Sequence, residues 1–197
     1  MTAQPGLTII VEGVTDAQLI RAILGDDIAK KVRFYAGQGR ASLATVGRNV
    51  LIHEGGPVLL VMDSDTLNPQ LTAELQALNL AALTGPLTAG VQRPAMAEPG
   101  TSQFQVFTFV PQIEAVFFEA PDVLDRLIGK KPPQEKVKEG HFIPKQVLAE
   151  LLANGMAPRD YKMVLEHLGP TAQQALATGP QASNLKATVE SLLAEAA

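Results

Sequence analysis

Three short apolar runs, each followed by a segment with helical periodicity, constrain the fold of this chain more than any other feature. The runs span residues 7–11, 32–36 and 57–62, and turn residues follow each of them. Short runs of this kind are typical of strands that are buried on both faces of a sheet. Because strands that alternate with helices pair in parallel, we expect a parallel sheet with helices on both faces.

Helical periodicity follows each predicted strand. Apolar residues recur at helical spacing up to Leu24, with Thr15 or Asp16 as the expected N-cap and Gly25 as the stop. Similar spacing predicts helices at 41–53 and at about 69–78. The segment 83–103 is rich in Gly, Pro, Thr and Ala, and we expect a long loop there.

The second half of the chain adds one strand and several helices. Alternation predicts a fourth strand at 104–110, and a helix opens with Pro111 near its start. A further helical segment at 121–129 and a charged connector at 130–144 precede helices that we expect at about 145–153, 158–168 and 183–195. We therefore expect a catalytic α/β domain at 1–120. The helical C-terminal extension at 121–197 would serve as a lid, a partner surface or a dimer surface.

Composition excludes several classes of protein. The chain has 197 residues, 46% of them apolar, which suits one domain with an appendage. The absence of cysteine excludes disulfides, thiol catalysis and cysteine zinc sites, and it fits a cytoplasmic protein. The N-terminus lacks the pattern of a signal peptide, and no apolar run approaches the roughly 20 residues that span a bilayer.

Net charge and aromatic content limit how the chain could bind nucleic acid. The formal net charge is −4, so such binding needs a local basic patch or a bound metal. The chain has no Trp, two Tyr and seven Phe, and we therefore expect no base-stacking platform.

Acidic residues stand at the carboxyl ends of two predicted strands. Asp63 and Asp65 follow the third strand, and because side chains alternate along a strand, we expect them to point to the same side. Glu12 follows the first strand, and in parallel sheets sites lie at the carboxyl ends of the strands. We expect the three carboxylates to meet in one crevice and to hold a cation. Turn formation and helix capping are the alternative roles for the two aspartates.

The two acidic motifs together resemble the Toprim domain, which topoisomerases, bacterial primases, small ribosomal-RNA maturases and OLD-family nucleases share. Glu12-Gly13 matches its glutamate motif, and Asp63-Ser64-Asp65 matches its D-x-D motif. Asp16 makes the sequence most similar to the OLD-type nucleases, and Glu114 stands where those proteins have a further acid. The resemblance covers about residues 7–120. It implies a Toprim-like (Rossmann-like) fold with a mostly parallel four-stranded sheet. The domain would be free-standing, without the ATPase domain of OLD proteins.

The resemblance also implies an activity, a cofactor and partners. A metal-dependent endonuclease would act on nucleic acid, DNA rather than RNA, in DNA repair or phage defence. Mg²⁺ or Mn²⁺ would be the cofactor, because hard cations prefer carboxylate oxygens. A separately encoded ATPase would be a partner, a homodimer is a further expectation, and no membrane is involved. The expected metal ligands are Glu12, Asp16, Asp63, Asp65 and Glu114, and the expected catalytic residues are Glu12, Asp63, Asp65 and Lys145.

Some of these residues have equally good structural roles. Asp16 could be a helix cap, and Glu114 could be an acid that is favoured in a first helical turn. Lys145 would stabilise developing negative charge.

Basic residues give the candidate contacts to nucleic acid. Arg40 follows the glycine turn 36–39, where backbone amides could approach a phosphate, although a plain turn explains the glycines as well. A basic patch is expected in the connector, at Lys130, Lys131, Lys136 and Lys138. A solvated loop is the alternative for this segment.

Two other functions are weighed against the nuclease. A Toprim-like module without catalysis would bind a nucleotide or a partner within a larger complex. A phosphatase of haloacid-dehalogenase type also has D-x-D after a strand, but its nucleophilic aspartate follows the first strand, where this chain has Glu12. After the D-x-D motif, topoisomerases and primases usually continue with acidic or glycine residues, whereas this chain continues with Thr66-Leu67-Asn68. This difference disfavours the topoisomerase and primase types of the Toprim domain.

Overall fold

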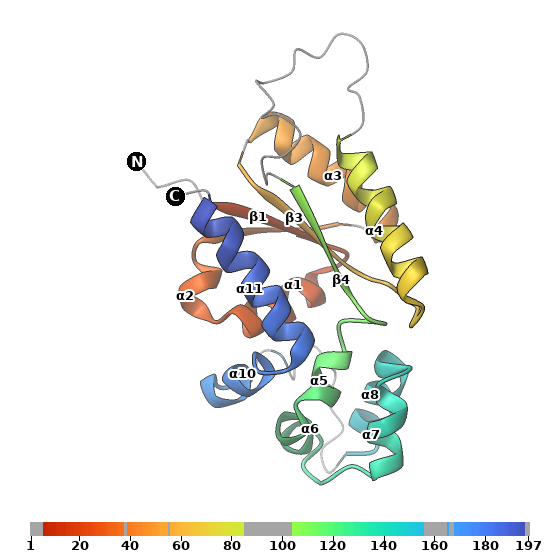
Figure 1. Ribbon diagram of the computed structural model, residues 1–197. Helices are drawn as coiled ribbons and strands as arrows, with labels where there is room; N and C mark the ends of the chain where they lie inside the picture. The colour runs from red at the N-terminus through yellow and green to blue at the C-terminus, as the bar shows by residue number, and fades with distance from the viewer. Residues whose placement is uncertain are drawn as a thin grey trace.

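A four-stranded parallel sheet forms the centre of the computed structural model (Figure 1), as the sequence predicts. The structure describes residues 6–37, 39–54, 56–84, 104–155, 165 and 168–195. The strands are β1 (Leu7–Val11), β2 (Val32–Ala36), β3 (Val58–Asp63) and β4 (Phe104–Phe109), in the order β2-β1-β3-β4.

Helices cover both faces of the sheet (Figure 1). They are α1 (Val14–Leu24), α2 (Asp26–Ala29), α3 (Arg40–His53), α4 (Pro69–Thr84), α5 (Ala115–Glu119), α6 (Pro121–Ile128), α7 (Gln134–Gly140), α8 (Pro144–Ala153), α10 (Pro170–Leu176) and α11 (Pro180–Glu195). Helices α3 and α4 lie on one face, and α1 and α11 lie on the other. The α/β fold class is therefore confirmed.

Strand alternation divides the apolar side chains between two cores. Leu59 and Val61 of β3 belong to the larger core, which they share with α1, α5 and the C-terminal helices. Leu60 and Met62 belong to the smaller core under α3 and α4. Because Asp63 continues the odd-numbered positions of β3, its side chain faces the layer of the larger core.

The strand order creates a switch point between β1 and β3. From β1 the chain moves to β2 on one side, and β3 then pairs with β1 on the other side. Helices on opposite faces diverge at such a point, and in open parallel sheets the crevice there binds ligands. Glu12 and Asp63 stand at the carboxyl ends of these two strands.

Several predicted boundaries are wrong. The first helix is capped by Gly13 instead of Thr15 or Asp16, and α4 continues to Thr84, beyond the predicted end at about 78. The helix predicted to open near Pro111 begins only at Ala115, because the preceding turn bonds to the end of β3. The short helices α2 and α10 are additional.

The charged connector 130–144 is not a simple loop, because it contains α7. Val137 of this helix packs against the larger core, which stabilises a helix in a charged segment. The loop predicted at 83–103 lies outside the described residues from residue 85 on, and residues 83 and 84 end α4. The helix predicted at 158–168 also lies outside them, except for residues 165 and 168.

The C-terminal helices share the larger core with the sheet. Leu185 and Val189 of α11 are fully buried in the same cluster as Ile9 of β1. The predicted division of the chain at residue 120 stays a prediction. Among the described helices, none has the length and apolar character needed to cross a membrane.

Candidate functional site

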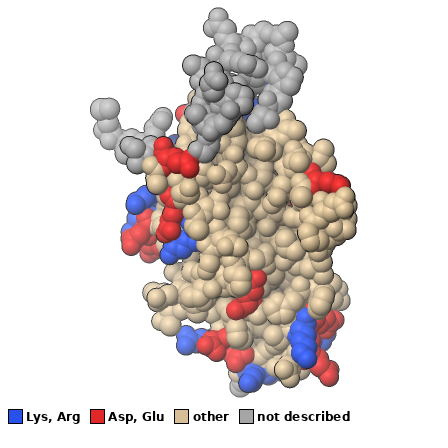
Figure 2. Space-filling model, viewed as in Figure 1, with Lys and Arg blue, Asp and Glu red and all other residues tan. Residues whose placement is uncertain are grey.

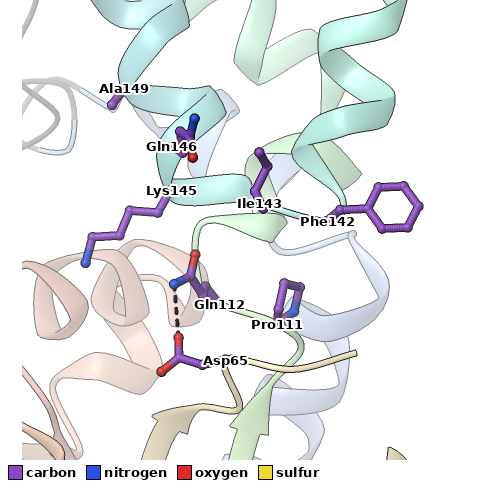
Figure 3. A pocket seen from close by; sticks show the side chains of 8 residues that line it. All are labelled: Asp65, Pro111, Gln112, Phe142, Ile143, Lys145, Gln146 and Ala149. Carbon is purple, nitrogen blue, oxygen red and sulfur yellow. Dashed lines mark hydrogen bonds between the residues drawn. The ribbon is translucent and has the colours of Figure 1, made fainter. Parts of the chain in front are cut away.

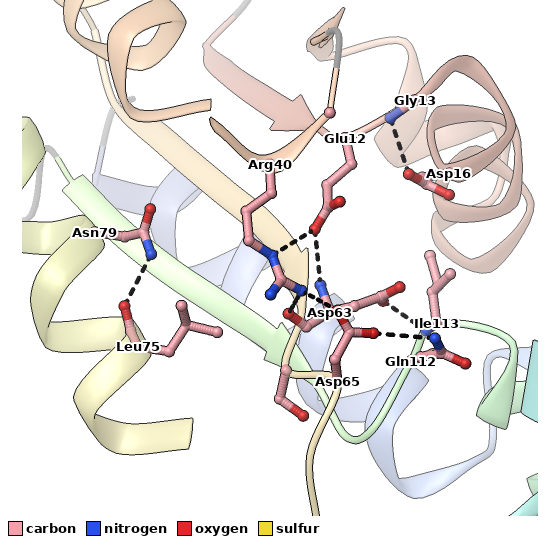
Figure 4. Close-up of polar contacts among 12 residues, drawn as sticks. Glu12, Gly13, Asp16, Arg40, Asp63, Asp65, Leu75, Asn79, Gln112 and Ile113 are labelled. Atoms are coloured by element: carbon pink, nitrogen blue, oxygen red, sulfur yellow. Dashed lines mark hydrogen bonds and ion pairs between the residues drawn. The ribbon is translucent and has the colours of Figure 1, made fainter. Parts of the chain in front are cut away.

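Glu12 and Asp63 come together at the switch point, as the sequence predicts. The backbone N–H of Asp63 lies 3.4 Å from Glu12 Oε1 (Figure 4). Asp63 Oδ1 accepts a hydrogen bond of 2.8 Å from the backbone N–H of Ile113, in the turn before α5. One carboxylate from each of two neighbouring strands therefore lies at the same edge of the sheet.

Asp16 and Glu114 complete an acidic cluster with Glu12 and Asp63. Asp16 Oδ2 accepts a hydrogen bond of 2.9 Å from the N–H of Gly13, so the side chain is fixed at the first turn of α1. Glu114 is only 4% exposed, and among the described residues its Oε2 has no hydrogen-bond partner. We call Glu12, Asp16, Asp63 and Glu114 the acidic cluster.

The raised pKa values of Asp63, Asp16 and Glu114 show that the negative charge of these three carboxyl groups is poorly compensated. Burial, and after it the charge of Glu114, raises the pKa of Asp63 to about 8, although the Ile113 N–H opposes this shift. Asp16 and Glu12 add smaller repulsions on Asp63. Burial is also the largest cause that raises the pKa of Asp16 and of Glu114. In the absence of a further cation, Asp63 therefore holds a proton near neutral pH.

Asp65 lies outside the cluster, and the argument that strand alternation aligns it with Asp63 is wrong. The strand ends at Asp63, and Asp65 has a positive φ of 52°, which breaks the alternation. Its Oδ1 accepts a bond of 3.0 Å from Gln112 Nε2, and its Oδ2 lies 2.7 Å from Arg40 Nη2. Asp65 therefore points at the first turn of α3 and at the turn before α5 (Figure 4).

Arg40 is the first residue of α3 and binds three groups of this edge. Besides Asp65, its Nη2 donates to the backbone carbonyl of Asp63 at 2.6 Å, and its Nε lies 3.4 Å from Glu12 Oε1. The guanidinium thus already occupies a place between expected metal ligands.

In the glycine turn before Arg40, the backbone amides of both glycines are already bonded within the protein. The N–H of Gly37 donates to the carbonyl of Val11, and the N–H of Gly39 donates to the carbonyl of Glu12. With its φ of 91°, Gly39 fits the alternative of a plain turn that needs glycine.

Lys145 approaches the acidic cluster from the C-terminal part of the chain. It lies in the first turn of α8, and its charge lowers the pKa of both Asp16 and Glu114, against the effect of burial. A lysine 31 positions beyond Glu114, the last of these carboxylates in the sequence, thus shares their electrostatic environment. Its catalytic role stays a proposal.

Three of the four residues of the acidic cluster line a small hollow, and Glu114 is not among the residues that line it. Glu12, Asp16 and Asp63 line it together with apolar side chains, and its volume is about 10 Å³, close to what one water molecule needs. Carboxylate oxygens, the unpartnered Glu114 Oε2 and this hollow fit a hard cation such as Mg²⁺ in chemistry and size. Among the described residues, however, no three acidic or histidine side chains converge on one point as ligands.

The predicted lysine patch is not a single basic surface. Lys136 makes ion pairs of 2.8 Å with Glu139 and 2.6 Å with Glu150, and Lys130 donates to the carbonyl of Asn154. On the face shown in Figure 2, blue and red side chains alternate along the lower edge, where α6 and α7 lie. Contact of this segment with nucleic acid stays a prediction.

Sequence reasoning missed Gln112 and Gln181. Gln112 binds Asp65, and its position two residues before Glu114 was the one available signal. Gln181, in the first turn of α11, bonds the backbone N–H and carbonyl of Val110 at 2.7 and 3.0 Å. It also donates to Glu119, so α11 holds the segment that leads into the turn at the acidic cluster. No pattern near residue 181 indicated this contact.

Comparison with known proteins gives structural neighbours at low identity. No family model and no curated protein matches the sequence. Solved structures of the C-terminal region of the OLD protein of Xanthomonas campestris pv. campestris are similar to this chain. One, phased with mercury, has a TM-score of 0.46 at 15% identity and covers 100% of this chain and 96% of that chain. Another, phased with iodine, has a TM-score of 0.44 at 16% identity and covers 100% of this chain and 95% of that chain.

Proposed function

We propose that this chain is a nuclease domain of Toprim type that uses Mg²⁺ or Mn²⁺ to cleave phosphodiester bonds in nucleic acid. The observation that carries the proposal is the acidic cluster at the switch point, where burial and mutual repulsion raise the pKa of Asp63 to about 8. Crowding of buried carboxylates costs folding free energy, and a divalent cation would offset that cost. The match of Glu12 and of Asp63-Ser64-Asp65 to the Toprim motifs supports the proposal.

The ligands of the cation would be Glu12, Asp16, Asp63 and Glu114. Asp65 would join them once it leaves Arg40. When bound, the cation would activate a water molecule and stabilise charge on the phosphate oxygens. Asp63 must lose its proton before it can serve as a ligand, because only the ionised carboxylate binds a metal well.

Lys145 and Arg40 would act on the substrate. Lys145 stands at the first turn of α8 beside the cluster, where its ammonium would stabilise negative charge that develops on a phosphate. Arg40 would exchange its ion pair with Asp65 for a phosphate oxygen, because guanidinium binds both anions in the same geometry.

A second candidate is a Toprim-like module that binds a nucleotide or a partner without catalysis. Two observations favour it. Arg40 neutralises Asp65 and contacts Glu12, and no three acidic side chains among the described residues converge as ligands. An arginine that replaces the cation permanently would leave a folded but inactive site.

Calorimetry and a nicking assay separate the two candidates. Mg²⁺ and Mn²⁺ are titrated into the wild type, into the Asp63→Ala and Asp65→Ala variants, and into the control Asp27→Ala. Asp27 lies in α2, its side chain is fully exposed, and it is remote from the acidic cluster. Nicking of supercoiled plasmid by the wild type and the control, with loss in both site variants, is the expected result. Metal binding without nicking of DNA or RNA would favour the binding module, and the absence of metal binding would refute the nuclease.

A further inference from the structure

A pocket beside the acidic cluster has walls of two chemical kinds. It has a volume of about 460 Å³ and is lined by Asp65, Pro111, Gln112, Phe142, Ile143, Lys145, Gln146 and Ala149. We call it the α8 pocket, because most of its lining comes from α8 and the residues just before that helix. Asp65 lines its floor, and Lys145 joins it to the acidic cluster, so a ligand here would lie next to the proposed reacting phosphate.

One wall of the α8 pocket is apolar and exposed. Phe142 is 62% exposed and Ile143 is 40% exposed, and Pro111 lines the pocket near them. Among the Phe and Tyr side chains that the structure describes, Phe142 is the one that is exposed. The expectation that the chain offers no base-stacking platform stays untested, and one exposed aromatic ring lines this pocket.

The other wall carries groups that bind polar edges and anions. Gln112 and Gln146 are carboxamides, which can donate and accept hydrogen bonds, and Lys145 carries a positive charge. In the view of Figure 3, Lys145 and Phe142 lie at opposite ends of the pocket, and Gln146 and Ile143 lie between them. Gln146 donates only a long bond of 3.4 Å to Glu150, which a ligand could displace.

This combination fits a nucleobase with its phosphate. Volumes of roughly 300 Å³ and above hold small ligands, and a flat base would use the apolar wall with its face and the carboxamides with its edge. The phosphate of the same nucleotide would face Lys145. In a duplex the faces and the pairing edge of each base are already covered, so the pocket can accept only an unpaired base.

We propose that the α8 pocket binds one unpaired base of the nucleic-acid chain, adjacent to the phosphate at the acidic cluster. The inference rests on the proposed function for its nucleic-acid substrate and adds to it the preferred substrate class, a single strand or a locally unpaired duplex. Base stacking on an exposed aromatic ring contributes about 1–3 kcal/mol, which corresponds to roughly 5- to 150-fold in affinity.

A binding experiment tests the proposal. A single-stranded dT oligonucleotide with one central 2-aminopurine, and the same oligonucleotide as a duplex, are titrated with protein in Ca²⁺ buffer. Quenching of the 2-aminopurine fluorescence reports stacking, and a gel verifies that the oligonucleotide stays intact. The proteins are the wild type, Phe142→Ala, Phe142→Tyr and Gln146→Leu. The matched control is Leu78→Ala, because Leu78 of α4 is 69% exposed and does not line the pocket.

Phe142→Ala should weaken binding of the single strand at least fivefold and abolish the quenching, whereas binding of the duplex should change less than twofold. Phe142→Tyr should retain both signals, Gln146→Leu should lower the affinity, and Leu78→Ala should match the wild type. Three outcomes would overturn the proposal. The wild type and Phe142→Ala could bind the single strand with equal affinity, or Phe142→Ala could lose as much affinity for the duplex as for the single strand. The third is that the wild type does not bind the oligonucleotide. Plasmid nicking by the wild type, together with equal affinity of the wild type and Phe142→Ala for the single strand, would refute this inference alone. Stacking without nicking would refute the proposed nuclease alone.

Discussion

The Asp63→Asn variant should be more stable than the wild type at neutral pH in metal-free buffer. In the folded protein the pKa of Asp63 is raised to about 8, from an ordinary value of 3.8, chiefly by burial and by the charge of Glu114. Asparagine has the shape of the carboxyl group and carries no charge, so it keeps the packing and removes the electrostatic cost.

The magnitude follows from proton linkage. Between pH 3.8 and about 8 the folded protein holds a proton on Asp63 that the unfolded chain has released, so the free energy of unfolding falls as the pH rises. Each pH unit corresponds to about 1.4 kcal/mol, which gives an upper limit of about 4 kcal/mol at pH 7. The asparagine variant escapes this loss, and its advantage should vanish below pH 4.

Urea denaturation at pH 4, 5, 6, 7 and 8 in EDTA measures the difference. We expect the variant to exceed the wild type by at least about 1 kcal/mol at pH 7, with a gap that narrows as the pH falls. The control is Asp27→Asn, whose side chain is fully exposed and should show no such gap. A gap that does not depend on pH, or a variant less stable than the wild type at pH 7, would refute the reasoning. Mg²⁺ should stabilise only the wild type.

Three further predictions concern neighbours of the acidic cluster. Arg40→Ala should raise the affinity for Mg²⁺ severalfold in calorimetry, because it frees Asp65 and Glu12 from a competing cation; weaker binding would show that the guanidinium organises the site. Gln181→Leu should lower the free energy of unfolding by about 1–3 kcal/mol in urea, because the backbone N–H of Val110 loses its partner; an unchanged midpoint would contradict this. Mg²⁺ binding at pH 7 should release about one proton from Asp63. In calorimetry this release appears as a binding heat that depends on the buffer's ionisation enthalpy. The affinity for Mg²⁺ should rise with pH up to about 8. A buffer-independent heat would mean that no protonated carboxyl is a ligand.

The strands and the meeting of Glu12 with Asp63 could be predicted, because both follow from short-range rules. A strand buried on both faces has few polar positions, so the runs at β1 and β3 stand out in the sequence. Parallel pairing then places their carboxyl ends together, whatever the loops between them do. The prediction needed no knowledge of side-chain packing.

The orientation of Asp65 could not be predicted, because it depends on a left-handed backbone and on contacts from distant segments. Arg40 and Gln112, which bind it, lie 25 and 47 positions away in the sequence. The place of Phe142 in one pocket with Asp65 could not be predicted either, because it depends on the packing of α8, whereas Lys145 was an expected residue of the site. Sequence patterns report burial and periodicity, and neither of them encodes which loop residues meet.

The charge balance of this edge explains why nucleic acid should bind weakly without metal. Five carboxylates, the cluster together with Asp65, face the two cations Arg40 and Lys145. The proton on Asp63 removes one negative charge, yet the edge stays anionic and repels a phosphodiester. A divalent cation would replace that proton and attract the phosphate at the same point. Apolar contact in the α8 pocket does not depend on this balance, so base binding and phosphate binding at this edge should respond differently to salt and to metal.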